Sequence, residues 1–420
     1  MDGRGILHSN RINLGDFVLA VSQALDLASP QIFDHAIRVA YIAFRISNLL
    51  EVEDEQQKDL LLAALLHDAG ISSTEMKMDA LEFDLGENAQ QHCIEGYNLF
   101  KNFYRFSQLS PLILYHHNLW EKVDKEENTR SNKVHENEEN QYNSYNCSHE
   151  FLGNLLHLAD RVEISIKRNQ FILEQVGKIQ EKINSRRGTT FAPYLVDTFN
   201  ELVDKEAFWL DLESGYSNKI ITDQVCKYQL EVPLSEVRDL SLIFAEIVDR
   251  KSPFTGRHSR GIAETSTQLA ESFGFSPHEC QQMEIAALLH DLGKLSVPNS
   301  ILEKPGPLEH QEMLIMKQHT FYTYHLLSRI EAFETIKEWA AFHHEKLNGK
   351  GYPFGLHASD ISLGARIMAV SDVYQALTEE RPYRKAMSQD KALSILEQMS
   401  RDFILDQKVV EKLKVITLPT

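Results

Sequence analysis

Apolar residues recur along most of the chain at intervals of three and four positions, which is the spacing of one face of an α-helix. Met283, Ala286, Ala287 and His290 stand at positions i, i+3, i+4 and i+7, so the histidine shares the stripe that faces the core. The residues flanking His35 follow the same spacing. Strict alternation of apolar and polar residues, typical of a half-buried strand, is scarce. The pattern predicts an all-α protein with histidines on the buried faces of its helices.

The two halves of the chain repeat one order of histidine and aspartate residues. The first half contains His35, His67, Asp68, His92, His116, His117 and Asp160, and the second contains His258, His290, Asp291, His319, His343, His344 and Asp372. The interval from the first histidine to the His-Asp pair is 32 residues in both halves (35 to 67 and 258 to 290), and that from the single to the double histidine is 24 (92 to 116 and 319 to 343). Equal intervals of this kind indicate an internal repeat.

Composition places the boundaries of the repeat. Residues 121–150 are rich in Glu, Asn, Lys and Ser and almost free of aliphatic residues, which predicts a solvated or disordered insertion. This insertion accounts for the longer interval before Asp160. A boundary near Val225 to Pro233 divides the chain into expected domains of residues 1–227 and 228–420, each within the usual size range. Ser276 before Pro277 and Ser388 to Asp390 predict helix starts.

Charge and hydropathy exclude several classes of partner. The 43 Lys and Arg residues and 61 Asp and Glu residues give a formal net charge of −18, which argues against a nucleic-acid polymer or an anionic membrane as partner. No apolar run approaches the ~20 residues that cross a bilayer, and the first residues lack a signal-peptide pattern, so we expect a cytoplasmic protein. The four cysteines form no CxxC pair, so neither a zinc knuckle nor a disulfide framework is indicated.

Histidine and carboxylate side chains drawn from several helices onto one interior face form a metal site. Neutral imidazoles with carboxylates suit Zn, Mn or Fe. On a helix, His290 and Asp291 would point about 100° apart, so the histidine can bind one ion while the carboxylate bridges to a second. His343 and His344 can likewise serve two ions. Two ions about 3.5–4 Å apart stabilise displacement at phosphorus and lower the pKa of a bridging water.

Three segments carry a more specific resemblance. HDLGK (His290 to Lys294), HHEKLNGKGYP (His343 to Pro353) and SDVYQALTEERPYR (Ser371 to Arg384) resemble the HD-GYP family, the branch of HD-domain metal-dependent phosphohydrolases that cleaves cyclic dinucleotides. The similarity covers about Leu240 to Met399. It implies two tandem HD-domain helical bundles, a degenerate HD-like domain at 1–227 and a catalytic HD-GYP domain at 228–420. The implied reaction is hydrolysis of cyclic di-GMP or 3′3′-cGAMP to a linear dinucleotide, and with a second cut to mononucleotides.

The resemblance also implies roles for individual residues. The metal ligands would be His258, His290, Asp291, His319, His343, His344 and Asp372. Asp291 and Lys294 would be catalytic, with Lys294 stabilising the phosphate under attack. Tyr352, Arg381 and Arg384 would contact the substrate, and the GYP loop is linked in the family to a signalling partner. The implied cofactors are two divalent transition metals, Fe or Mn first, with Ni, Co or Zn as alternatives.

Two departures from the family pattern bear on these roles. Some members have a glutamate four residues before the first ligand histidine that supports a third metal, and Phe254 stands there in this chain, which favours two metals. The HPxxG pattern around the third ligand histidine reads His319, Thr320, Phe321, Tyr322 and Thr323. Because the proline and the glycine are both missing, we expect a reshaped pocket mouth and an effect on substrate preference.

The first half keeps every ligand type but loses the groups that would bind phosphate. Ile71 stands at the lysine position, there is no GYP triplet, and the nearest cations after Asp160 are Lys167 and Arg168. We therefore expect a second metal site with little or no turnover, at His35, His67, Asp68, His92, His116, His117 and Asp160. Three alternatives remain open for this half: a stable core of clustered histidines, a regulatory role or a dimer-forming role.

Two competing functions remain for the whole chain. A phosphohydrolase acting on mononucleotides is disfavoured by the GYP and RPYR segments. A non-catalytic sensor or interaction protein is disfavoured because all seven ligand positions and Lys294 are present. Whether the chain forms a homodimer is left open by the sequence.

Overall fold

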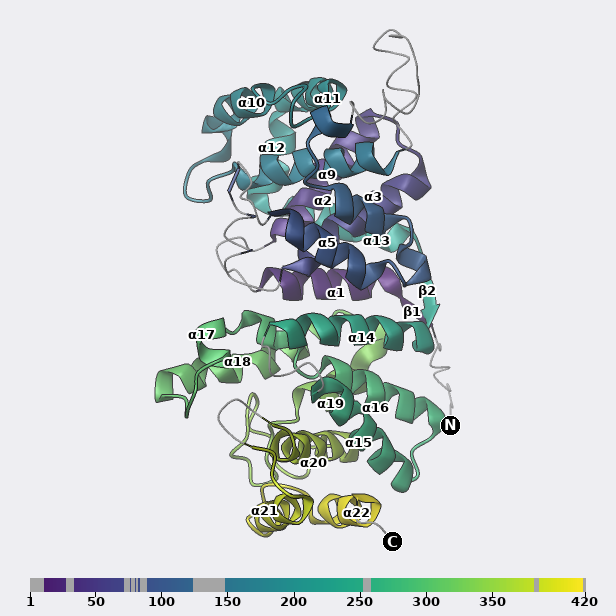
Figure 1. Ribbon diagram of the computed structural model, residues 1–420, viewed down its shortest axis with the longest axis vertical. Coiled ribbons are helices and arrows are strands. Elements are labelled where there is room, and N and C mark those ends of the chain that lie inside the picture. Colours follow the sequence, from purple (N-terminus) through teal and green to yellow (C-terminus); the bar gives the residue numbers. More distant parts are fainter. Residues whose placement is uncertain are drawn as a thin grey trace, which may run out of the picture. The chain divides into compact units, whose positions relative to one another are not determined.

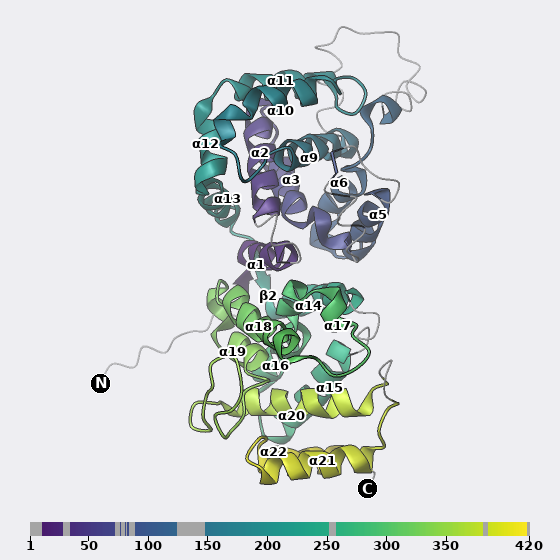
Figure 2. The same cartoon turned by 90° about the vertical axis from the view of Figure 1, so that its left-hand side faces the viewer.

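A computed structural model describes residues 11–27, 34–71, 76, 80, 82–83, 89–123, 148–251, 258–380 and 385–417 of the 420-residue chain. Its contacts divide the chain into two compact units. The N-terminal unit is Gln31–Gln229, and the C-terminal unit is Leu230–Thr420 together with Met1–Pro30. Both units consist almost entirely of helices (Figures 1 and 2), which confirms the predicted all-α class.

The N-terminal unit is a helical bundle. Its helices are α2 (His35–Leu49), α3 (Asp54–Leu66), α5 (Ala89–Phe100), α6 (Leu109–Tyr115), α9 (His149–Ile164), α10 (Val176–Asn184), α11 (Pro193–Val203), α12 (Glu206–Ser214) and α13 (Tyr216–Lys227), with 3-10 helices η2 (His67–Gly70), η3 (Tyr104–Phe106) and η4 (Ile172–Glu174). Aromatic residues fill part of its core, since Tyr41 stacks on Phe208 and Phe208 meets Trp209 edge to face. All three are fully buried.

The C-terminal unit contains the helices of the second repeat. They are α14 (Leu234–Arg250), α15 (His258–Ser272), α16 (Pro277–Leu289), α17 (Asn299–Leu302), α18 (His310–Leu327), α19 (Glu334–Ala341), α20 (Leu363–Thr378), α21 (Gln389–Arg401) and α22 (Gln407–Thr417), with 3-10 helices η5 (Leu292–Ser296) and η6 (Glu331–Phe333). Ser276 caps α16 through a reciprocal bond pair with Glu279, and Ser388 directly precedes α21, as the sequence predicted.

The sequence repeat is also a repeat of packing. In the N-terminal unit α2 contacts α3 and α9, α5 contacts η2, and α5 contacts α6. In the C-terminal unit the equivalent contacts join α15 to α16 and α20, α18 to η5, and α18 to α19. The two copies therefore place their repeated histidines and aspartates on equivalent elements.

The first residues of the chain depart from the predicted domain division. Strand β1 (Arg11–Asn13) pairs antiparallel with β2 (Glu231–Pro233), and helix α1 (Leu14–Asp26) follows β1 as α14 follows β2. Phe17 of α1 is fully buried against Phe244 and Phe333, with ring centroids 5.5 and 6.1 Å apart. The predicted domain of residues 1–227 is therefore wrong at its start, because this apolar contact and the β pairing join α1 to the C-terminal unit.

Both ends of the predicted insertion of residues 121–150 are helical, against the expectation for those positions. Val123 is buried, and the Ser148 hydroxyl accepts the Phe151 amide at 3.1 Å to cap α9. Residues 124–147 lie outside the described residues. Within the part of the chain that the structure describes, none of the helices combines the length and apolar character needed to span a membrane.

Candidate metal centre

Two clusters of side chains meet in the interior of the C-terminal unit. The first is formed by His258 at the start of α15, His290 after the last residue of α16, and Asp372 within α20. The second is formed by His319 on α18 with His343 and His344, which follow α19. In each cluster one ligand atom per residue lies within 4.8 Å of the others.

Asp291 lies between the two clusters and faces both. One carboxylate oxygen, Oδ2, is 3.1 Å from His290 Nε2 in the first cluster. The other, Oδ1, is 3.6 Å from His319 Nε2 and 4.0 Å from His343 Nε2 in the second. A carboxylate with one oxygen toward each cluster has the position of a bridging ligand. The seven predicted ligands of the second half are thus brought together.

Backbone carbonyl groups orient three of the histidines. The Nδ1 atoms of His290, His319 and His343 bond the carbonyl oxygens three residues earlier, at 2.7, 2.6 and 2.6 Å. Donation from Nδ1 leaves the Nε2 lone pair pointing into the cluster, as metal-ligating histidines require. Burial lowers the pKa of His319 to about 3 and holds the pKa of His343 well below its usual value, so both rings are neutral.

A carboxylate orients the first histidine instead. His258 Nδ1 donates to Glu379 Oε2 at 2.8 Å, and its Nε2 lies 3.5 Å from Asp372 Oδ1. Burial opposes the charged ring, but the bonds to Asp372 and Glu379 outweigh it and raise the pKa of His258 to about 9. The position of Glu379, directly after α20, was not predicted from the sequence.

Two buried polar atoms between the clusters bear on whether the donor set fits a divalent metal. His290 Nε2 and Asp291 Oδ1 are buried and form no hydrogen bond among the described residues, although Asp291 Oδ2 lies 3.1 Å from His290 Nε2. Buried polar atoms normally have one, so both are explained by a cation between the clusters. Imidazole nitrogens with carboxylate oxygens suit a first-row divalent metal. The residues therefore fit the metal centre that the sequence predicted.

The His-Asp pair itself lies in a different local structure from the one expected. Helix α16 ends at Leu289, and after Asp291 the chain continues as the 3-10 helix η5. The turn brings Gly293 against the backbone of His319, where a Cβ atom would stand 2.0 Å from the carbonyl oxygen. His290 and Asp291 therefore lie in the turn between α16 and η5, and not on one α-helix as the sequence predicted.

Lys294 supplies the positive charge beside the bridging carboxylate. Its ammonium group forms a short ion pair with Asp291 Oδ2. Burial opposes ionisation of Asp291, yet the nearby charges of His290 and Lys294 outweigh it and hold the pKa of that carboxyl well below its usual range. The Lys294 side chain is 23% exposed, so it reaches toward the solvent side of the centre.

The GYP loop stands at the same centre. The ring of Tyr352 lies 4.9 Å from the ring of His344 and 6.4 Å from that of His319, measured between centroids. The Lys317 ammonium lies 5.4 Å from the centroid of the Tyr352 ring. Tyr352 is therefore placed beside the second cluster, where the sequence predicted a substrate contact.

Thr323 occupies the position of the missing family glycine. It is fully buried, accepts the amide of Gly293 at 3.0 Å and donates to the carbonyl of His290 at 3.1 Å. The hydroxyl thus fastens α18 to the His-Asp turn. This direction of the side chain gives no support to the expected effect on the pocket mouth. Arg381, Arg384 and Phe254 lie outside the described residues.

The N-terminal unit builds similar clusters. His35, His67 and Asp160 form one group, and His67, Asp68 and His116 form another. A third contains His92, His116 and His117 together with Cys93, which the sequence did not single out. His67 Nδ1 and His116 Nδ1 bond the carbonyls of Ala64 and Ile113, as in the other copy.

Charged residues of the N-terminal unit change the chemistry around Asp160. Arg161 is 1% exposed, and its guanidinium bonds Asp160 Oδ2 at 2.6 Å. Glu163 accepts from His35 Nδ1 at 2.6 Å and from Arg38 Nε at 2.9 Å. Arg161 replaces Val373 of the second copy, so a buried cation already compensates Asp160. The bound guanidinium of Arg161 therefore weakens the attraction of the Asp160 carboxylate for a divalent ion.

Sequence reasoning missed several charged or thiol residues that lie beside the two centres. They are Arg38, Arg161, Glu163, Glu379 and Cys93, together with Glu345, which accepts backbone amides of the GYP loop. Glu163 and Glu379 each accept a hydrogen bond from Nδ1 of the first histidine of their copy. Glu163 lies three residues after Asp160, whereas Glu379 lies seven residues after Asp372. Because the offsets differ, the comparison of the two halves could not reveal them.

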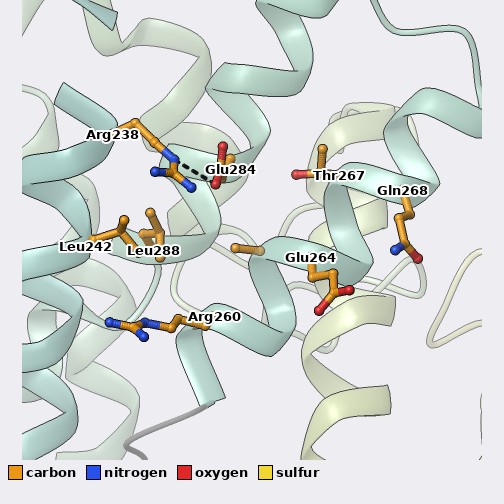
Figure 3. Close-up of a pocket in the computed structure, with 9 residues that line it drawn as sticks. Arg238, Leu242, Arg260, Glu264, Thr267, Gln268, Glu284 and Leu288 are labelled. Atoms are coloured by element: carbon orange, nitrogen blue, oxygen red, sulfur yellow. Dashed lines mark hydrogen bonds and ion pairs between the residues drawn. The ribbon is translucent and has the colours of Figure 1, made fainter. Parts of the chain in front are cut away.

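A separate surface pocket of about 530 Å³ lies among α14, α15 and α16 (Figure 3). Arg238 and Glu284, joined by a 2.9 Å hydrogen bond, line it together with Arg260 and Glu264. Arg260 and Glu264 follow His258 by two and six residues, which places them on the far side of α15 from that histidine. The pocket is therefore distinct from the metal centre.

Comparison with known proteins agrees with this geometry. Family models of the HD domain match residues 32–147 and residues 243–409. The chain is 30% identical over 395 residues to 3′3′-cGAMP-specific phosphodiesterase 1 of Vibrio cholerae, which covers 92% of this chain and 87% of that protein. The chain is also 29% identical over 442 residues to 3′3′-cGAMP-specific phosphodiesterase 3 of V. cholerae. This match covers 93% of this chain and 91% of that protein.

Two further relatives complete the comparison. The cyclic di-GMP phosphodiesterase response regulator RpfG of Xanthomonas campestris is 38% identical over 185 residues, 44% of this chain and 48% of that protein. A crystal structure of a cyclic GMP-AMP specific phosphodiesterase of V. cholerae, V-cGAP3, superposes with a TM-score of 0.65 at 26% identity. It covers 97% of this chain and 99% of that one.

The repeated bundles and their His-Asp clusters define a protein of the metal-dependent HD-domain class. The chain belongs to the HD-GYP branch of that family, with two HD domains in tandem.

Proposed function

We propose that this chain is a cyclic-dinucleotide phosphodiesterase that hydrolyses 3′3′-cGAMP at the centre of its C-terminal unit. The choice of 3′3′-cGAMP as substrate rests on the extent of the similarity. Two relatives that match more than nine-tenths of this chain, and so both HD domains, are named 3′3′-cGAMP-specific. Cyclic di-GMP is the second candidate. RpfG, named for that substrate, matches only 44% of this chain but at the higher identity of 38%.

Seven side chains would hold two divalent ions, with Fe or Mn favoured by the mixture of imidazole and carboxylate donors. His258, His290 and Asp372 would hold one, and His319, His343 and His344 the other, with Asp291 between them. When bound, such ions lower the pKa of water and neutralise phosphate oxygens.

The other side chains of the centre would act directly on the phosphodiester. Hydrolysis breaks the bond between phosphorus and the 3′ oxygen, and water supplies a hydroxyl group to phosphorus and a proton to the leaving oxygen. Lys294 would stabilise the negative charge that grows on the phosphate in the transition state. Tyr352 would contact the substrate beside His344. Arg381 and Arg384 would hold the substrate phosphates.

The N-terminal unit would contribute no turnover of its own. Ile71 replaces the lysine of the second copy, and Arg161 compensates the carboxylate that would serve as a ligand. With Ile71 at the lysine position, the part of this unit that the structure describes offers no equivalent of Lys294 to stabilise the transition state.

The test is a comparison of the two copies in the full chain. Protein reconstituted with Mn²⁺ or Fe²⁺ is assayed on 3′3′-cGAMP, cyclic di-GMP and mononucleotides, beside the variants His290→Ala and His67→Ala. We expect linear dinucleotide from 3′3′-cGAMP, its loss in His290→Ala and its retention in His67→Ala. The proposal fails if no cyclic dinucleotide is cleaved, and the choice of copy fails if a folded His67→Ala variant alone is inactive.

A further inference from the structure

Cys93 lies within a compact group of nitrogen donors in the N-terminal unit. One ligand atom each from His92, Cys93, His116 and His117 lies within 4.8 Å of the others, and all four residues are buried. Cys93 Sγ is 3.9 Å from His92 Nε2 and 4.0 Å from His116 Nε2. The two nitrogen atoms are 3.2 Å apart.

These separations match a tetrahedral zinc site. With Zn–N distances of about 2.0–2.1 Å and a Zn–S distance of about 2.3 Å, tetrahedral angles place two nitrogen ligands about 3.3 Å apart and a sulfur about 3.6 Å from a nitrogen. The three separations among His92, Cys93 and His116 lie within about half an ångström of these values. The ligand atom of His117 lies within 4.8 Å of the other three.

The histidines give independent support for a ligand at this position. His116 Nδ1 bonds the carbonyl of Ile113 at 2.6 Å, which leaves its Nε2 lone pair directed at His92. His117 is 4% exposed, and its Nδ1 is buried with no hydrogen-bond partner among the described residues. A buried imidazole nitrogen in that state is explained by a bound cation.

The second copy shows what Cys93 changes. Its equivalent position holds Thr320, whose hydroxyl donates to the carbonyl of Lys317 at 3.1 Å and is directed away from metal ligation. A thiolate among imidazoles favours a softer ion than the carboxylate-rich centre of the C-terminal unit does. Near Asp160, by contrast, Arg161 already supplies a buried positive charge.

We propose that the N-terminal unit binds one zinc ion through His92, Cys93, His116 and His117. Four protein ligands close the coordination sphere, as in structural zinc sites, so the ion joins α5 to the chain that follows α6 and performs no chemistry. On binding, the cysteine sulfur exchanges its proton for the metal. Asp68 Oδ1, 3.8 Å from His92 Nε2, offsets part of the remaining positive charge. The proposal is independent of the reaction proposed above.

The experiment loads the metal-free full chain with Co²⁺ as a spectroscopic substitute for zinc and records the near-ultraviolet spectrum. A sulfur-to-cobalt charge-transfer band is expected from the wild type, since only a thiolate ligand produces it. Cys93→Thr, which introduces the residue of the second copy, should lose the band and bind one equivalent of zinc fewer. The matched control is Cys280→Ser, because Cys280 is also buried but its sulfur faces the carbonyl of Phe275.

Each outcome decides the question. A charge-transfer band that disappears only in Cys93→Thr supports the site. Absence of the band from the cobalt-loaded wild type overturns it, and this result needs no variant to fold. Persistence of the band in Cys93→Thr, or its loss in Cys280→Ser, also overturns it.

Discussion

Glu345 Oε1 accepts a hydrogen bond from the backbone amide of Phe354 at 2.7 Å. The same carboxylate accepts the amides of Gly355 at 3.1 Å and Leu356 at 3.0 Å. Glu345 is 3% exposed and directly follows His343 and His344 in the chain. One buried side chain therefore ties the GYP loop to the segment that carries two of the proposed metal ligands.

The first prediction concerns this tie. In Glu345→Gln an amide nitrogen replaces one acceptor, so at least one of the three loop amides loses its partner. The loop then holds Tyr352 less accurately, and we expect kcat/KM for the cyclic dinucleotide to fall by about 10- to 100-fold. Metal content, measured by elemental analysis, should not change. Glu334→Gln is the control, because the exposed Glu334 pairs with Lys337 and not with the loop; an equal loss there would contradict the explanation.

The second prediction separates Lys294 from the metal ligands. Lys294→Met removes the cation that we propose stabilises the phosphate, but no proposed ligand, so kcat should fall by about 10²- to 10³-fold. Metal content should stay the same or rise, because Asp291 loses a competing positive charge. Lys304, half-buried like Lys294 and paired with Glu309 and Glu312, provides the control variant Lys304→Met. A purely structural Lys294 would instead show loss of metal together with loss of activity.

The third prediction follows from the two hydrogen bonds of Thr323. Thr323→Val keeps the shape of the side chain but leaves the Gly293 amide and the His290 carbonyl without partners. The free energy of unfolding should fall by about 1–3 kcal/mol in denaturant titrations. The ratio of activities on 3′3′-cGAMP and cyclic di-GMP should stay constant, since the hydroxyl is directed at the His-Asp turn. A changed ratio would restore the expectation drawn from the sequence. Thr320→Val, which loses only a bond within its own helix, should cost less.

The fold class, and the gathering of the repeated histidines and aspartates into clusters, were predictable because both depend on spacing. Apolar stripes at helical period place His290 on a buried face, and equal intervals in the two halves indicate the same packing twice. Packing partners were not predictable in this way. The apolar face of α1 resembles that of any core helix. Its sequence pattern does not show that Phe17 packs against Phe244 and Phe333 of the C-terminal unit, and not against the N-terminal unit that follows α1 in the chain.

The supporting residues of the site were missed for a related reason. Cys93 lacked a neighbouring cysteine, and its partners His116 and His117 come from a different part of the chain. Arg161 looked like an ordinary charge, and only the fold shows it buried against Asp160. Glu379 depends on where α20 stops, because it reaches His258 only from the extended backbone after Thr378.

The last prediction tests that support. Glu379 accepts hydrogen bonds from His258 Nδ1 at 2.8 Å and from Gln375 Nε2 at 2.6 Å. In Glu379→Gln an amide nitrogen must face one of these two donors. The substitution also removes the negative charge that makes His258 a stronger ligand. The metal concentration for half-maximal activity should rise by about 10- to 100-fold, as for other partners of metal-bound histidines. At saturating Mn²⁺, kcat should return to near the wild-type value, because Glu379 acts through His258 and does not touch the substrate. Glu163→Gln makes the same change beside His35 in the N-terminal unit and should leave both quantities unaltered. A lowered kcat at saturating metal with an unchanged metal requirement would show that Glu379 takes part in the reaction itself.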